Sequence, residues 1–171
     1  MNPAAFQAPP DPQDVLPELP AYDLIELFFF AYRDFVSDPD RILADLGFGR
    51  AHHRVLHFVD RQPGLTIAEL LDILRITKQS LNRVLKELIE KGFIESRTGT
   101  IDRRQRLLHT TERGHELAHR MAHLQTQRVT RALAMAGPEA KGTLQRYLLA
   151  MIDADDRAHV EQLVFGEEAR R

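Results

Sequence analysis

The side chains in this 171-residue sequence that are most suited to chemistry are polar and basic, and they gather in one stretch. Between residues 75 and 106, nine Lys and Arg residues stand against four Asp and Glu residues, whereas the whole chain has a formal net charge of −2. Residues 1–46 carry two basic and nine acidic residues. A concentrated positive field in an otherwise acidic chain favours a surface that binds a polyanion. A solvated charged face without a partner would have the same composition.

The start of one predicted helix carries the residue types that read bases in a DNA major groove. Gln pairs bidentately with adenine, Lys prefers guanine, and Ser or Thr contacts either bases or phosphates. The residues of this helix expected to contact a duplex or its backbone are Thr77, Lys78, Gln79, Ser80, Asn82, Arg83 and Lys86. Two helices buried in a protein core would show the same apolar periodicity.

The sequence offers no constellation typical of an enzyme. It has no Gly-rich phosphate loop, no Gly-x-Ser-x-Gly elbow, no His-Glu-x-x-His pair and no Cys. The lack of Cys excludes disulfides, Cys-ligated zinc and sensing by thiol oxidation. We therefore expect no catalysis and no cofactor.

Histidines are the remaining candidates for chemistry, and several have the i, i+4 spacing of a chelating pair. They form two groups, one of His52, His53 and His57 and the other of His115, His119 and His123. Imidazole suits Zn or Ni, so a metal-sensing role is an alternative. Because no Asp or Glu completes an obvious local site, we expect a solvated or interface face and no metal, and a buried, hydrogen-bonded His52.

Four predicted helices precede and position the basic stretch. Residues 21–36 carry two apolar stripes, which need a cover on more than one side, and a partner subunit would supply the second. Asp38 and Pro39 predict an N-cap and first residue of a separate short helix that ends at Leu46. A further helix lies between Gly49 and Pro63. Thr66 begins a capping box for the next helix.

The basic helix itself begins at the predicted cap Thr77, after a three-residue gap, and ends at Gly92. Residues 93–97 and 106–110 read as two short strands joined by a turn. A long helix follows from residue 112 to 136, with Thr111 as its cap, and stops at Gly137. One last helix follows, with an apolar seam of Leu144, Tyr147, Leu148, Met151 and Ile152 that is typical of a helix–helix interface.

Two capped helices with a short turn form a helix-turn-helix pattern, and the basic hairpin makes it a winged helix. The order of elements resembles the MarR family of bacterial transcription regulators. The strings that carry the resemblance are RVL at residues 54–56, PGLTIAEL at 63–70, KGFI at 91–94, DRR at 102–104 and TERG at 111–114. The strings FFFAYRDF at residues 28–35 and FGRAHHR at 48–54 are similar to a PetP-like branch of that family found in alphaproteobacteria.

The resemblance implies a homodimer that binds pseudo-palindromic double-stranded DNA, with recognition helices in successive major grooves and wings in the flanking minor grooves. It implies that Asp102 braces Arg104 and that Arg104 enters the minor groove, whose negative potential attracts a guanidinium. A surface ion pair that only stabilises the turn is the alternative for these two residues. The other wing residues expected at the DNA are Arg97, Arg103 and Arg106.

The resemblance also implies an effector site between the dimerisation helices and the winged helix. Its aromatic walls and cationic groups would suit a small aromatic or amphipathic anionic ligand. The residues expected to line it are Phe29, Tyr32, Arg33, Arg50, His53 and His57. The same aromatic residues could instead belong to the core.

The sequence therefore predicts a mostly α fold with a small β-hairpin wing, formed by a winged helix-turn-helix and terminal dimerisation helices. Residues 1–20 form a Pro-rich flexible arm, residues 21–47 the N-terminal dimerisation helices, residues 48–114 the DNA-binding domain and residues 115–171 the C-terminal dimerisation helices. No apolar run approaches a membrane span and no secretory signal is visible, so we expect a cytoplasmic protein without a membrane partner. The alternatives are a winged helix that binds another protein and a His-based metal-responsive regulator.

Overall fold

The computed structural model describes residues 19–99 and 104–166. The chain divides into two units, Met1–Asp34 and Phe35–Arg171, and the division falls within the first helix, α1 (Tyr22–Ala44). Seven helices and three strands occur in the described residues. The mostly helical fold with a small sheet confirms the predicted fold class.

Helix α1 continues through Pro39, so the predicted break with Asp38 as the N-cap of a second helix is wrong. The Asp38 carboxylate is used elsewhere: its Oδ2 accepts a hydrogen bond of 2.9 Å from Arg128 Nη2, and its Oδ1 lies 3.5 Å from Arg41 Nη1. Pro39 is buried between the buried residues Val36 and Leu43. Burial on this helix face offsets the backbone hydrogen bond that an interior proline removes.

The described part of the N-terminal unit, residues 19–34, is the start of α1 with its leading residues, and its apolar side chains are exposed. They are Leu19, Tyr22, Leu24, Ile25, Leu27, Phe28, Phe29, Phe30 and Tyr32. No helix in the described part of the chain has the length and apolar character needed to span a membrane.

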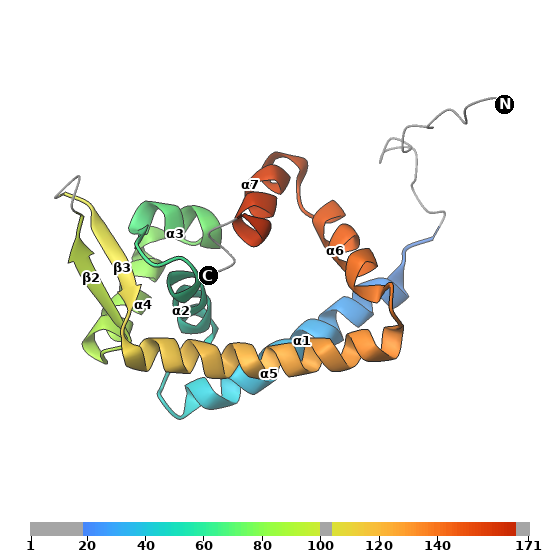
Figure 1. Ribbon diagram of the computed structural model, residues 1–171, viewed down its shortest axis with the longest axis horizontal. Coiled ribbons are helices and arrows are strands. Elements are labelled where there is room, and N and C mark those ends of the chain that lie inside the picture. The colour runs from blue at the N-terminus through green and yellow to red at the C-terminus, as the bar shows by residue number, and fades with distance from the viewer. Residues whose placement is uncertain (1–18, 100–103, 167–171) are drawn as a thin grey trace. The chain divides into compact units, whose positions relative to one another are not determined.

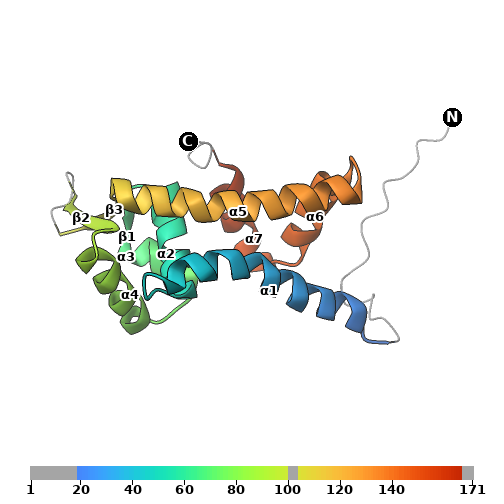
Figure 2. The same cartoon turned by 90° about the horizontal axis from the view of Figure 1, so that it is seen from below.

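The second unit contains the winged helix. Helix α2 (Arg50–Arg61) is followed by strand β1 (Leu65–Thr66), the helices α3 (Ile67–Leu74) and α4 (Lys78–Glu90), and the hairpin of β2 (Ile94–Thr98) and β3 (Arg106–Thr110). The sheet is antiparallel in the order β1–β3–β2, with Leu65 opposite Leu108 and Ser96 also opposite Leu108. Strand β1 was not predicted, because two residues are too short to show an alternating pattern. Figures 1 and 2 show these elements gathered at the N-terminal end of the long helix α5.

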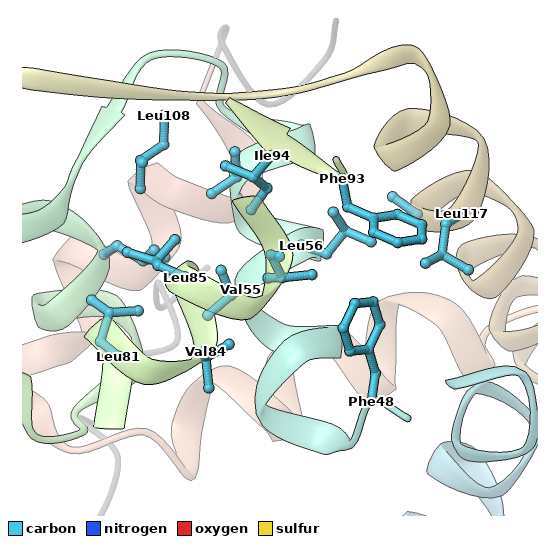
Figure 3. Packing of buried hydrophobic residues seen from close by; sticks show 14 of the residues in the cluster. Phe48, Val55, Leu56, Leu81, Val84, Leu85, Phe93, Ile94, Leu108 and Leu117 are labelled. Atoms are coloured by element: carbon cyan, nitrogen blue, oxygen red, sulfur yellow. The ribbon is translucent and has the colours of Figure 1, made fainter. Parts of the chain in front are cut away.

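One hydrophobic core holds the winged helix and the first turns of α5 together. Val55 and Leu56 on α2 lie among Leu81, Val84 and Leu85 on α4, as Figure 3 shows. Phe93 and Phe48 meet edge to face with their ring centroids 5.2 Å apart. The five aliphatic side chains of α2 and α4 named above are at most 4% exposed. Because the apolar face of α4 is buried in this core, its opposite, polar face must point to solvent.

The predicted helix caps are confirmed at three positions. Thr66 forms the capping box, in which its Oγ1 accepts from Glu69 N at 3.2 Å and the Glu69 carboxylate accepts from Thr66 N at 2.7 Å. Thr77 Oγ1 accepts from Ser80 N at 3.2 Å, and Thr111 Oγ1 accepts from Gly114 N at 3.1 Å. These side chains satisfy backbone donors that the first helical turn leaves unpaired.

The C-terminal part departs from the prediction. Helix α5 (Glu112–Ala136) ends at Gly137 as expected, but the single last helix is two, α6 (Ala140–Ala150) and α7 (Ala154–Phe165). The guanidinium of Arg157 donates to the carbonyl oxygens of Leu149, Ala150 and Ile152, which satisfies the C-terminal end of α6. The predicted apolar seam therefore covers α6 only, and Met151 and Ile152 lie at the break.

Candidate nucleic-acid interface

Helix α4 presents a polar and basic face to solvent. Its inward residues Leu81, Val84, Leu85 and Leu88 are buried, and its outward residues are exposed. The exposed set contains every residue predicted for this helix and its cap: Thr77, Lys78, Gln79, Ser80, Asn82, Arg83 and Lys86. The structure therefore brings all seven to one surface, and their contact with DNA stays a prediction.

The first turn of α4 follows directly on the short link from α3. The link from α3 consists of Arg75, Ile76 and Thr77, and Arg75 adopts the left-handed conformation with φ 49°. The N-terminal end of a helix carries a partial positive charge and free backbone donors, which attract phosphate. Lys78, Gln79 and Ser80 lie at this end, so charge and base-reading groups coincide there.

The wing carries three of the predicted cationic residues in the described part of the chain. Arg97 Nε donates to the Glu95 carboxylate at 2.9 Å, and Arg106 Nη1 donates to Thr98 Oγ1 at 3.3 Å. Arg104 is exposed in the turn before β3. The predicted residues Asp102 and Arg103 lie outside the described residues, so the brace between Asp102 and Arg104 stays a prediction.

The base of the wing is joined tightly to α5. Thr111 N donates to the Phe93 carbonyl at 3.1 Å, and Thr111 Oγ1 donates to the Gly92 carbonyl at 2.8 Å. Gly114 is required here, because a Cβ at this position would lie only 2.0 Å from the carbonyl oxygen of Phe93. The Thr-x-x-Gly start of α5 thus fixes the hairpin to the long helix.

His52 connects α2 to the recognition-type helix α4. Its Nδ1 accepts from Gly49 N at 3.2 Å, which leaves Nε2 as the ring nitrogen that donates to Glu87 Oε2 at 2.9 Å. The ring also stacks on Phe48 with centroids 4.6 Å apart. The predicted hydrogen bonding of His52 is confirmed, whereas its side chain is 11% exposed and so only partly buried.

The residues predicted for an effector fall into both units. In the N-terminal unit, Phe29 and Tyr32 are exposed and Arg33 pairs with Asp34 at 2.8 Å, which raises the Arg33 pKa. In the second unit, Arg50 Nε donates to Asp40 Oδ2 at 2.9 Å. The predicted effector site stays a prediction.

The remaining two predicted effector residues, His53 and His57, have pKa values lowered by burial. Burial lowers the pKa of His53, and repulsion from His57 lowers it further. Burial also lowers the pKa of His57, with a further contribution from Arg61. Burying a charged imidazolium costs free energy, so both rings favour the neutral form.

Sequence reasoning missed contacts between distant segments. Arg75 Nη2 donates to Asp156 Oδ1 at 2.5 Å, and His159 Nε2 lies 3.7 Å from Asp72 Oδ2, so α7 contacts the helix-turn-helix. Asp60, at the end of α2, lies beside His115 and His119 of α5. Neither contact has a signal in local spacing, because the partners are far apart in sequence.

Comparison with known proteins is consistent with this geometry. The sequence model of the MarR family matches residues 46–105, which span α2 to the wing. The HTH-type transcriptional regulator PetP of Rhodobacter capsulatus is 49% identical over 143 residues, 84% of this chain and 86% of that protein.

Two solved structures share the fold. The transcriptional regulator SlyA aligns with a TM-score of 0.65 at 19% identity, covering 81% of this chain and 99% of its own. A mutant of S. aureus MepR bound to an oligodeoxyribonucleotide aligns with a TM-score of 0.53 at 18% identity, covering 75% of this chain and 94% of its own.

Proposed function

The chain belongs to the MarR family of transcription regulators, and from that premise we propose that it binds double-stranded DNA of a particular sequence as a homodimer. It is a transcription regulator and not an enzyme.

The observation that carries the proposal is the exposed face of α4. A helix with one buried apolar face and an opposite face of Lys, Gln, Asn and Arg fits the width of a major groove. Gln79 and Asn82 supply bidentate base-reading amides, and Arg83 supplies a cation for a guanine or a phosphate. The capped N-terminus of α4 would face the phosphates, where its partial charge is favourable.

The hairpin would add contacts in the flanking minor groove. Arg104 lies at its turn, and Arg97 and Arg106 lie on its two strands. Cationic side chains at a narrow minor groove gain from its enhanced negative potential. The MepR relative, whose structure contains an oligodeoxyribonucleotide, supports the proposal through its shared fold.

A homodimer would bury the apolar residues that the chain leaves exposed. On α6, Leu144, Tyr147 and Leu148 are 42, 41 and 43% exposed. Contiguous exposed apolar side chains mark interaction surfaces. A second copy would also present a second α4, so the operator would be pseudo-palindromic.

We further propose that a small aromatic or amphipathic anion modulates the DNA affinity. Arg50 supplies a cation at the start of α2, the helix that also carries His53 and His57, whose pKa values are lowered by burial. Such a ligand changes DNA affinity only when it prefers one of two arrangements of the recognition helices. This role is tested by measuring DNA affinity with and without a small aromatic carboxylate. We expect the carboxylate to change the affinity of the wild type and to have no effect on Arg50→Ala.

The proposed function is tested by selection from a random duplex library with the full-length protein. We expect enrichment of one pseudo-palindromic motif whose half-sites are about one helical turn apart. A Gln79→Ala variant should change the selected bases, and an Asp72→Asn variant, altered outside the proposed DNA-binding set, should select the same motif. Failure to enrich any motif would contradict the proposal.

A further inference from the structure

We propose that Asp60, His115 and His119 form a binding site for a divalent transition ion such as Zn²⁺. Asp60 lies near the C-terminal end of α2, and the two histidines lie in the first two turns of α5. One ligand atom from each side chain lies within 4.8 Å of the others. None of the three belongs to the proposed DNA-binding set, so this site does not depend on the proposed function.

The three side chains already surround a common point. His115 Nδ1 lies 2.8 Å from Asp60 Oδ1, His119 Nε2 lies 4.0 Å from Asp60 Oδ2, and the imidazole centroids are 4.1 Å apart. In a tetrahedral zinc site with bonds of about 2.0–2.2 Å, neighbouring ligand atoms are separated by about 3.3 Å. The two distances between ligand atoms, 2.8 Å and 4.0 Å, lie on either side of that value. An ion would therefore replace the bond between His115 and the carboxylate after small side-chain rotations.

The donor set indicates the class of ion. Two imidazole nitrogens and one carboxylate oxygen suit Zn²⁺ and similar borderline ions. Mg²⁺ and Ca²⁺ prefer oxygen ligands, so this set disfavours them. The i, i+4 spacing places both imidazoles on one face of α5, and the fold supplies the carboxylate from another helix.

The surroundings of Asp60 favour coordination. Thr110 Oγ1 donates to Asp60 Oδ1 at 3.0 Å, which orients the carboxylate as outer hydrogen bonds orient metal ligands. The Asp60 side chain is 8% exposed, whereas those of His115 and His119 are 56% and 68% exposed. The three residues border an open hollow of about 870 Å³ that also contains Glu69. An ion can enter from this side, and water can occupy the fourth position.

Spacing along α5 does not by itself identify the two ligand histidines, because a third histidine on this helix has the same spacing. His119 and His123 also have the i, i+4 spacing, but His123 Nε2 lies 2.9 Å from Gln127 Nε2. Within residues 19–99 and 104–166, Asp60, His115 and His119 are the one trio of His, Asp or Glu side chains that meets the 4.8 Å separation. The structure thus selects His115 and His119 from three equally spaced candidates.

A bound ion would join the end of α2 and the start of α5. Because it requires the folded arrangement, it stabilises the folded chain by mass action. We therefore expect added Zn²⁺ to raise the Tm of the full-length protein. The rise should disappear when a ligand is removed.

The test uses full-length protein without a polyhistidine tag, freed of metal by a chelator and then dialysed. Co²⁺ is titrated in and followed by its visible d–d absorption, and Zn²⁺ is added to displace it. We expect one ion per chain, and a loss of affinity of at least about tenfold in His115→Asn and His119→Asn. His123→Asn is the matched control and should bind Co²⁺ as the wild type does.

Both ligand histidines are exposed, so their variants should fold, and circular dichroism checks this. Asp60→Asn gives a further comparison if it retains the wild-type spectrum. The proposal is overturned if His115→Asn and His119→Asn bind Co²⁺ and Zn²⁺ like the wild type. It is also overturned if His123→Asn alone abolishes binding, or if the wild type binds neither ion.

Discussion

At Gly114, helix α5 passes so close to Phe93 that no side chain fits between the two backbones. A Gly114→Ala substitution would force the start of α5 away from the base of the wing. We expect the free energy of unfolding to fall by about 1–3 kcal/mol, as for other overpacked sites. Chemical denaturation measures this change.

Gly142 supplies the control for that substitution. It lies inside α6, and a Cβ there would meet only the end of the flexible Arg146 side chain, at 3.4 Å. Gly142→Ala should leave stability unchanged or raise it by up to about 1 kcal/mol, because Ala favours the helix. Equal effects of the two substitutions would show that the close approach at Gly114 has no energetic consequence.

The buried histidines predict a pH dependence of stability. Because the pKa of His53 is lowered from 6.5 in the folded chain, the unfolded chain binds a proton first as the pH falls. The contribution of His53 to the free energy of unfolding is therefore fully present above about pH 6.5 and decreases as the pH falls below that value. Denaturant midpoints measured between pH 7.5 and 5 should show a shallower decline in His53→Gln, and an unchanged slope would refute the assignment.

Single residues were predictable where their partners are close in sequence. The caps at Thr66, Thr77 and Thr111 bond to backbone groups within the next three residues, so spacing alone identified them. The carboxylate beside His115 was missed because Asp60 is 55 residues away and reaches it only through the fold. Local spacing therefore carries no signal for an acidic side chain beside His115.

At the scale of elements, the helix-turn-helix and wing were predicted closely, whereas two helix boundaries were not. The strands expected at residues 93–97 and 106–110 lie at Ile94–Thr98 and Arg106–Thr110. The prediction of a new helix with Asp38 as N-cap and Pro39 as first residue was wrong. The Asp38 carboxylate accepts a hydrogen bond from Arg128 instead, and Pro39 is buried within α1. The break after α6 was missed because its end is satisfied by Arg157 of the following helix.

The recognition helix and the wing should respond differently to substitution. Gln79→Ala on α4 should relax the preference at one base position by about 1–3 kcal/mol, because a bidentate base contact is lost. Arg104→Ala on the wing should weaken binding to all sequences and lower the slope of log K against log salt by about one unit. Anisotropy titrations on matched and single-base-changed duplexes measure both effects.

The two variants serve as controls for each other. If Gln79→Ala changes only the salt slope, α4 contacts phosphates and not bases. If neither variant differs from the wild type, these residues do not contact DNA.

At the scale of the whole molecule, the account requires two copies. A charge at Leu148 on the exposed apolar face of α6 should produce monomers and abolish specific binding, because a monomer presents one recognition helix and loses the second, linked contact. Light scattering after gel filtration measures the mass of Leu148→Asp. Arg146→Asp, two residues from both Leu144 and Leu148 and therefore on the opposite face of the same helix, should stay dimeric. A dimeric, fully active Leu148→Asp protein would contradict this interface.

The measurement that tests the central claim most directly is the affinity of the full-length protein for the selected duplex and for a scrambled duplex, across a salt series. Fluorescence anisotropy gives both affinities under identical conditions. We predict a preference of about a thousandfold or more for the selected duplex, with an affinity that falls steeply as salt rises. Equal and weak binding to both duplexes would contradict the claim that α4 and the wing read DNA.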